Sequence, residues 1–162
     1  MRMRAIGRVP ILVAGLLLAS VGQVAKAGEE VLAVTGSDGS AISFDLDALR
    51  ALPVSEIRTS TIWTDGIQVF QGVSLRDLLD HVDAVEGTIT AVALNDYLID
   101  IPTSDATRPG PVVAYLRNGE QMSVRDKGPL WIIYPYDDNP DYNTEEYYAR
   151  SIWQLIRLEV PK

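Results

Sequence analysis

Short apolar segments separated by turn residues recur along most of the chain, and this pattern predicts many short strands. Residues 31–36 and 41–44 flank Ser37-Asp38-Gly39-Ser40, which predicts a β-hairpin. A second hairpin is expected where Asn118-Gly119 turns the chain into 121–124. The other expected strands are 55–63, 67–70, 88–94, 97–101, 112–116, 130–134 and 152–160.

Helical periodicity is confined to short stretches. Asp45 is expected to cap a short helix that ends before Pro53. Ser74 and Asp77 resemble a capping box at the start of a helix over 74–82. One buried stripe on that helix is predicted from the spacing i, i+3, i+4 and i+7, namely Leu75, Leu78, Leu79 and Val82. With a helical turn at 144–150, after a polar loop at 137–143, the pattern predicts a single α+β domain, mostly mixed β with a few short helices.

The first 27 residues have the three parts of a secretory signal peptide. Arg2, Arg4 and Arg8 precede a short apolar run, and Ala25-Lys26-Ala27 follows it. The run is shorter than the roughly 20 residues that a membrane-spanning helix needs. We therefore expect cleavage after Ala27, release into the periplasm, no membrane span after cleavage, and one folded domain at 28–162.

Charge and composition narrow the function classes. Four of the 14 basic residues and none of the 22 acidic residues fall in 1–27, so residues 28–162 carry a formal net charge of −12. Such a chain repels nucleic acid and anionic lipid, so no nucleic-acid partner is expected. The sequence has no Cys, which excludes disulfides, a thiolate nucleophile and a Cys metal ligand. The only His, His81, is expected on a helix surface, so no metal site is predicted.

Three groups of residues could bind a ligand. Arg125 and Lys127 form a pair of cations in a turn, which could hold an anion or a carbonyl or could simply be solvated beside Asp126. The sequence Asn95-Asp96-Tyr97 lies at a break between two expected strands. It could form hydrogen bonds with the edge of a pyrimidine-like ring, or it could form an Asx turn. Aromatic side chains near polar turns could stack on a flat heterocycle or pack in the core. These are Trp63, Tyr97, Trp131, Tyr134, Tyr136, Tyr142, Tyr147, Tyr148 and Trp153.

Core packing is the better interpretation for Trp131 and Tyr134, which lie in an apolar strand. Trp63 lies beside the Asp65-Gly66 turn and is less easily explained as a core residue.

Read together, several segments resemble the sulfite-oxidase-type molybdopterin-binding fold. The run Phe70-Gln71-Gly72-Val73-Ser74-Leu75-Arg76-Asp77-Leu78-Leu79 is similar to one stretch of that fold, and Ala93-Leu94-Asn95-Asp96-Tyr97 followed by Ile101-Pro102 to another. The pattern continues in order through Asn118-Gly119, Gly128-Pro129-Leu130, Ile132-Ile133-Tyr134-Pro135 and Ile152-Trp153-Gln154-Leu155. The resemblance covers about residues 30–160 and implies that fold.

Two departures from the family change the expected function. In the catalytic members a Cys binds molybdenum near the position of Thr59–Trp63, where this chain has no Cys. Ile152 replaces a Lys that helps to hold the cofactor's phosphate. The chain is more similar to the short secreted pterin-binding proteins of this fold (PruR type). That similarity lies in Arg125–Pro135, Asp137-Asp138, Arg150 and Trp153-Gln154-Leu155.

This resemblance implies a non-catalytic periplasmic protein with a pterin as ligand and no molybdenum. Its partner would be the periplasmic domain of a membrane-bound sensor, in cyclic-di-GMP or histidine-kinase signalling. Two alternatives stay open, a molybdopterin-dependent oxidoreductase or a subunit of one, and an assembly protein that binds no pterin. For the pterin we expect stacking on Trp63, contacts of the ring edge with Asn95, Asp96 and Tyr97, and contacts of the ring carbonyl with Arg125, Lys127 or Arg150.

Overall fold

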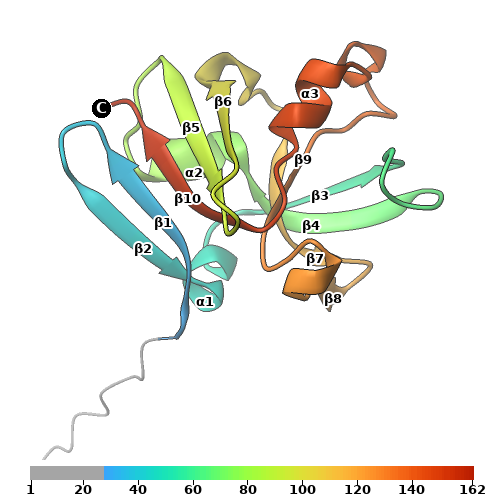
Figure 1. The fold of residues 1–162 in the computed structure, drawn as a ribbon, viewed down its shortest axis with the longest axis horizontal. Coiled ribbons are helices and arrows are strands. Elements are labelled where there is room, and N and C mark those ends of the chain that lie inside the picture. The colour runs from blue at the N-terminus through green and yellow to red at the C-terminus, as the bar shows by residue number, and fades with distance from the viewer. Residues whose placement is uncertain (1–27) are drawn as a thin grey trace, which may run out of the picture.

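Two five-stranded sheets form the body of the protein (Figure 1). The computed structural model describes residues 28–162, so the signal peptide predicted at 1–27 lies outside the described residues. The first sheet has the order β2-β1-β10-β5-β6. Its strands are β1 (Glu30–Gly36), β2 (Ala41–Asp45), β5 (Thr88–Ala93), β6 (Leu98–Pro102) and β10 (Leu155–Val160). The last strand, β10, lies at the centre, parallel to β1 and antiparallel to β5.

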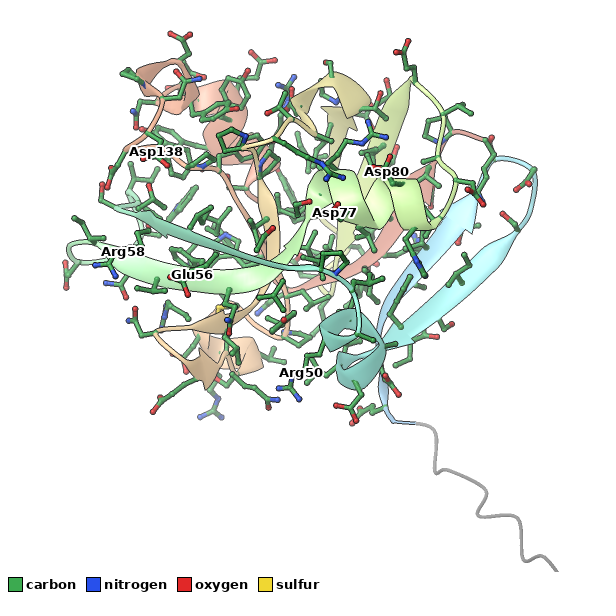
Figure 2. The ribbon with its side chains drawn as sticks, turned by 180° about the vertical axis from the view of Figure 1, so that it is seen from behind. Arg50, Glu56, Arg58, Asp77, Asp80 and Asp138 are labelled. Atoms are coloured by element: carbon green, nitrogen blue, oxygen red, sulfur yellow. The ribbon has the colours of Figure 1, made fainter. Side chains whose placement is uncertain are left out.

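The second sheet has the order β3-β4-β7-β8, and β9 also pairs with β7. Its strands are β3 (Val54–Thr59), β4 (Gln68–Ser74), β7 (Val112–Arg117), β8 (Glu120–Gln121) and β9 (Trp131–Ile133). Seen from behind, Glu56 and Arg58 project from β3, a strand at one edge of this sheet (Figure 2). Charges on an edge strand oppose pairing with a second chain.

Short helices connect the strands. They are α1 (Leu46–Arg50), α2 (Leu75–His81), α3 (Glu145–Arg150) and the 3-10 turns η1 (Thr103–Asp105), η2 (Val124–Asp126) and η3 (Pro140–Tyr142). The predicted caps are confirmed, because the Asp45 carboxylate accepts from Ala48 N at 2.7 Å and Ser74 Oγ accepts from Asp77 N at 2.9 Å. The predicted stripe is buried, and α2 packs its Leu75, Leu78 and Leu79 into the core.

Three predicted strands fall three or more residues short of their expected range at one end. The strand expected at 55–63 ends at Thr59, because the N–H of Ser60 donates to Asp137 instead of to a neighbouring strand. The strand expected at 121–124 ends at Gln121, and Val124 begins η2. The strand expected at 152–160 begins only at Leu155, since Gln154 takes a left-handed conformation with φ 53°.

The buried side chains form two clusters. The larger one includes the residues of α2 and the inner face of the first sheet. The smaller one contains Phe70, Val112, Ala114, Met122, Trp131 and Ile133. Trp63 packs against both clusters. Within 28–162 no helix is long and apolar enough to cross a membrane.

Candidate functional site

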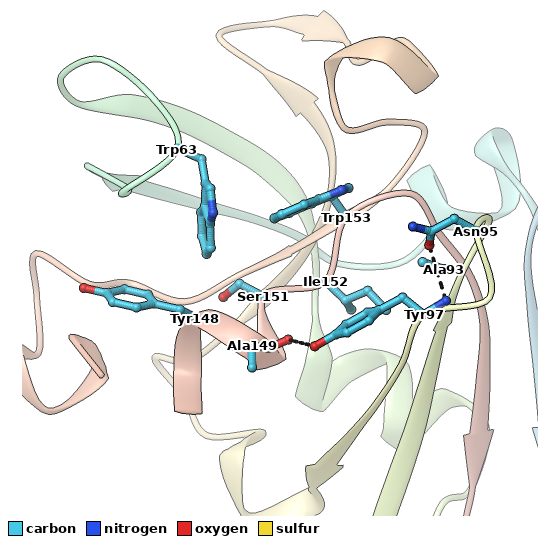
Figure 3. Close-up of a pocket in the computed structure, with 9 residues that line it drawn as sticks. All are labelled: Trp63, Ala93, Asn95, Tyr97, Tyr148, Ala149, Ser151, Ile152 and Trp153. Atoms are coloured by element: carbon cyan, nitrogen blue, oxygen red, sulfur yellow. Dashed lines mark hydrogen bonds between the residues drawn. The ribbon is translucent and has the colours of Figure 1, made fainter. Parts of the chain in front are cut away.

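A cavity of about 360 Å³ opens where segments distant in sequence meet (Figure 3). The β3–β4 loop contributes Trp63, and the β5–β6 turn contributes Ala93, Asn95 and Tyr97. The end of α3 and the segment leading into β10 complete it with Tyr148, Ala149, Ser151, Ile152 and Trp153. The cavity therefore lies at the junction of both sheets and α3.

Aromatic rings make up much of the cavity wall. The Trp63 ring lies 5.6 Å from Trp153 and 5.8 Å from Tyr148, centroid to centroid, both in edge-to-face geometry. Trp63 also meets the fully buried Trp131 at 5.8 Å. Edge-to-face packing holds these rings in fixed orientations. Trp63 is thus both a packing residue, half-buried against two clusters, and part of the cavity wall.

Polar groups of the cavity come from two facing segments. Asn95 Oδ1 accepts from Tyr97 N at 3.3 Å, and its amide nitrogen has no acceptor among the described residues. The Tyr97 hydroxyl donates to the Ala149 carbonyl at 3.5 Å, which links the β5–β6 turn to α3 (Figure 3). The hydroxyl of Ser151 contacts Tyr136 and donates to Tyr147 O. In the part of the chain that the structure describes, no residue that lines this cavity is charged.

Lys127 lies beside the cavity without lining it. Its ammonium is 4.1 Å from the Trp153 ring centroid and 5.5 Å from that of Trp131, a cation–π geometry. Burial, and next the positive charge of Arg117, lower the pKa of the Lys127 ammonium. The backbone of Lys127 is left-handed, with φ 76°, and its carbonyl accepts from Gln154 N.

Arg150, the last residue of α3, forms a buried ion pair with Asp105 of η1. Its guanidinium donates to Asp105 at 3.1 Å and also pairs with Glu146. The Tyr134 hydroxyl donates to the same Asp105 carboxylate at 2.8 Å. Burial, and next the charge of Asp105, raise the pKa of Tyr134. This pair therefore fixes the end of α3 on which Tyr148 and Ala149 lie.

The structure brings together only some of the residues expected to bind a ligand. Trp63, Asn95 and Tyr97 line the same cavity. Asp96 is exposed, has a left-handed backbone with φ 64° and does not line it. The three predicted cations also lie outside the lining: Arg125 is exposed in η2, Lys127 packs on Trp153, and Arg150 pairs with Asp105.

Six lining residues were not assigned to a site by the sequence, namely Ala93, Tyr148, Ala149, Ser151, Ile152 and Trp153. Tyr148 and Trp153 stood out only as aromatic side chains near polar turns. Trp131 and Tyr134 are fully buried, which confirms their interpretation as core residues.

The donor set around the cavity does not fit a molybdenum ion. Thiolate ligands are excluded because the sequence has no Cys. Residues 28–162 hold no group of three or more His, Asp and Glu side chains arranged for a metal. Within the stretch Thr59–Trp63, the N–H and the hydroxyl of Ser60 are both bonded to Asp137. The site instead offers aromatic faces and uncharged polar groups.

Comparison with known proteins supports the fold alone. No protein-family model matches the chain, and no curated protein matches it. Among solved structures, the crystal structure of the sulfane dehydrogenase SoxCD from Paracoccus pantotrophus is similar, with a TM-score of 0.60 and 16% sequence identity. The match covers 80% of this chain and 37% of that chain, so this chain spans little more than a third of that one's length. The fold is accordingly the expected one, a single α+β domain consistent with a sulfite-oxidase-like fold.

Proposed function

We propose that this chain is a non-catalytic, periplasmic pterin-binding protein of the short secreted type (PruR type). The observation that carries the proposal is the uncharged, aromatic cavity between Trp63, Trp153, Tyr97 and Tyr148. Its volume of about 360 Å³ falls within the usual range for small-molecule sites, about 300–1,000 Å³.

A pterin matches the chemistry of this cavity. It is flat and neutral, so its faces suit the Trp and Tyr rings, and no cation in the lining is needed to hold it. Its ring carbonyl can accept from the free amide nitrogen of Asn95. Its ring N–H groups can donate to the oxygens of Asn95, Tyr97 and Ala149. The aromatic faces and uncharged polar groups together favour a flat heterocycle over an anion.

The alternative function is a molybdopterin-dependent oxidoreductase or a subunit of one. The lack of Cys and of charged lining residues favours binding over molybdenum redox chemistry. Elemental analysis of protein purified from the periplasm distinguishes the two. We expect molybdenum far below one atom per chain, and a stoichiometric content would favour the enzyme.

The proposed partner is the periplasmic domain of a membrane-bound sensor, and the ligand would control that association. This part of the proposal is supported by the resemblance to secreted pterin-binding proteins. Photo-crosslinking in intact cells tests it, with purified membranes probed for a crosslinked sensor. If Trp63→Ala leaves the crosslinking to a sensor unchanged, the ligand does not control the association.

Calorimetric titration of a reduced pterin into the purified protein tests the binding site. Trp63→Ala removes stacking worth roughly 0.5–1.5 kcal/mol together with buried apolar area, so affinity should fall by about tenfold to a hundredfold. Asn95→Ala should weaken binding by about tenfold or more, because the side chain is proposed to bond both the ring carbonyl and a ring N–H. Ile62→Ala is the matched control, because Ile62 lies in the same loop as Trp63 and is 61% exposed.

Circular dichroism must first show that each variant is folded. A folded Trp63→Ala protein that binds the pterin as tightly as wild type would remove Trp63 from the site. Mass spectrometry of whatever co-purifies with the wild-type protein identifies the ligand independently.

A further inference from the structure

The loop that carries Trp63 is tied to the distant Asp137 close to its start. Ser60 N donates to Asp137 Oδ2 at 2.7 Å, and Ser60 Oγ donates to Asp137 Oδ1 at 2.6 Å. In return, Asp137 N donates to Thr59 Oγ1 at 3.1 Å. Both carboxylate oxygens are therefore occupied, and hydrogen bonds to a charged group are stronger than neutral ones.

Little else in this loop holds it against the protein. Ile62 and Ile67 are 61% and 63% exposed, so neither side chain contributes much packing. The hydroxyls of Thr61 and Thr64 bond to each other at 2.8 Å, and Thr61 Oγ1 accepts from Trp63 N, so these contacts shape the turn without attaching it. The inward position of Trp63 thus depends on its own ring packing and on the Asp137 anchor.

Asp137 itself is held on a rigid base. It follows Tyr136, which is 2% exposed and whose hydroxyl contacts Ser151 in the cavity lining. The Tyr136 carbonyl accepts from Asn143 Nδ2 at 3.2 Å. One short segment therefore connects Ser151 on one side of the cavity to the loop that carries Trp63 on the other.

We propose that Asp137 is a positioning residue for the ligand site, which sets the place of Trp63 without touching the ligand. This inference rests on the proposed binding function. When the anchor is lost, the Trp63 ring occupies the wall position for a smaller fraction of the time. Apparent affinity falls in proportion to the fraction of protein in the binding-competent state.

Asp137→Ala tests the proposal, and Asp138→Ala is the matched control. Asp138 is the next carboxylate in the chain, is exposed (Figure 2) and makes no side-chain hydrogen bond within residues 28–162. We expect Asp137→Ala to weaken binding of a reduced pterin by about threefold to tenfold and Asp138→Ala to leave it unchanged. Asp137→Asn, which keeps the side-chain shape, replaces the alanine variant if that protein does not fold.

A double-mutant cycle separates positioning from general destabilisation. If Asp137 acts through Trp63, Asp137→Ala should change affinity by less than about twofold when Trp63 is already Ala. Acrylamide quenching of tryptophan fluorescence reads the position of Trp63 without any ligand. Asp137→Ala should increase quenching, and the increase should disappear in a Trp63→Phe background.

Equal loss of affinity in the wild-type and Trp63→Ala backgrounds would overturn the proposal, and so would unchanged quenching or an equal effect of Asp138→Ala. If the wild-type protein binds no pterin, the proposed function fails. The quenching result then decides the role of Asp137 alone.

Discussion

Replacing Asp105 by Ala removes the carboxylate that accepts hydrogen bonds from both Arg150 and Tyr134. Asp105 is 7% exposed and Arg150 is 14% exposed, so water cannot replace the lost carboxylate for either donor. Arg150 keeps its pair with Glu146, whose side chain is 65% exposed, and its cation–π contact with the Tyr147 ring at 5.3 Å. The substitution therefore leaves a buried guanidinium and a buried hydroxyl with fewer partners than they need.

The size of the effect follows from this burial. Removing one partner of a buried ion pair costs about 3–5 kcal/mol. The remaining Glu146 contact places the expected loss near the lower end, about 3 kcal/mol. For a domain of this size each kcal/mol lowers the melting temperature by about 3–4 °C, so Asp105→Ala should melt about 10 °C below wild type.

Differential scanning calorimetry measures this change, with Asp80→Ala as the control. Asp80 pairs with Arg76 and Arg108 on the surface of α2, where its side chain is 48% exposed. Exposed pairs contribute about 0–1 kcal/mol, so Asp80→Ala should lower the melting temperature by no more than about 4 °C. Equal melting temperatures for the two variants would refute the claim that burial makes the Asp105 pair strong.

Three further outcomes are expected. Burial raises the pKa of Tyr136 to about 12, so its contribution to stability is complete below about pH 10 and is lost as the pH rises toward about 12. Urea unfolding at about pH 9 and about pH 11 should show this loss, and Tyr136→Phe should reduce it. Gly72→Ala should destabilise the fold by about 3 kcal/mol, because a Cβ would lie 2.0 Å from the Val113 carbonyl oxygen. A variant whose denaturation midpoint equals that of the wild-type protein would contradict this. N-terminal sequencing should show that the exported protein begins at Gly28. Soluble cytoplasmic protein that starts at Met1 would contradict the predicted signal peptide.

Local signals made much of the fold predictable. The capping box at Ser74 and the apolar spacing after it depend on neighbouring residues only, so sequence was sufficient to place α2. The end of β3 was not predictable in this way. Thr59–Trp63 is rich in residues that favour strands, yet the strand ends at Thr59 because Asp137, distant in sequence, takes the Ser60 N–H.

The site was predictable only in part, for the same reason. Trp63, Asn95 and Tyr97 lie near turns that the sequence marks, and the cavity includes them. Ala149 and Ile152 are ordinary small and apolar residues, and only the packing of α3 brings them to the cavity. Arg150 carries the charge that a ligand could use, but Asp105 binds it, and nothing in the sequence links these two positions.

The central place of β10 in the first sheet affects the order of folding. Because β10 pairs with both β1 and β5, the first sheet has a gap in its middle until residues 155–160 are available. The β1–β10 contact closes a loop of more than a hundred residues, and such distant pairings make folding slow. Ile152 and Trp153 lie just before β10, so the cavity is completed only after a newly made chain has been synthesised past these residues.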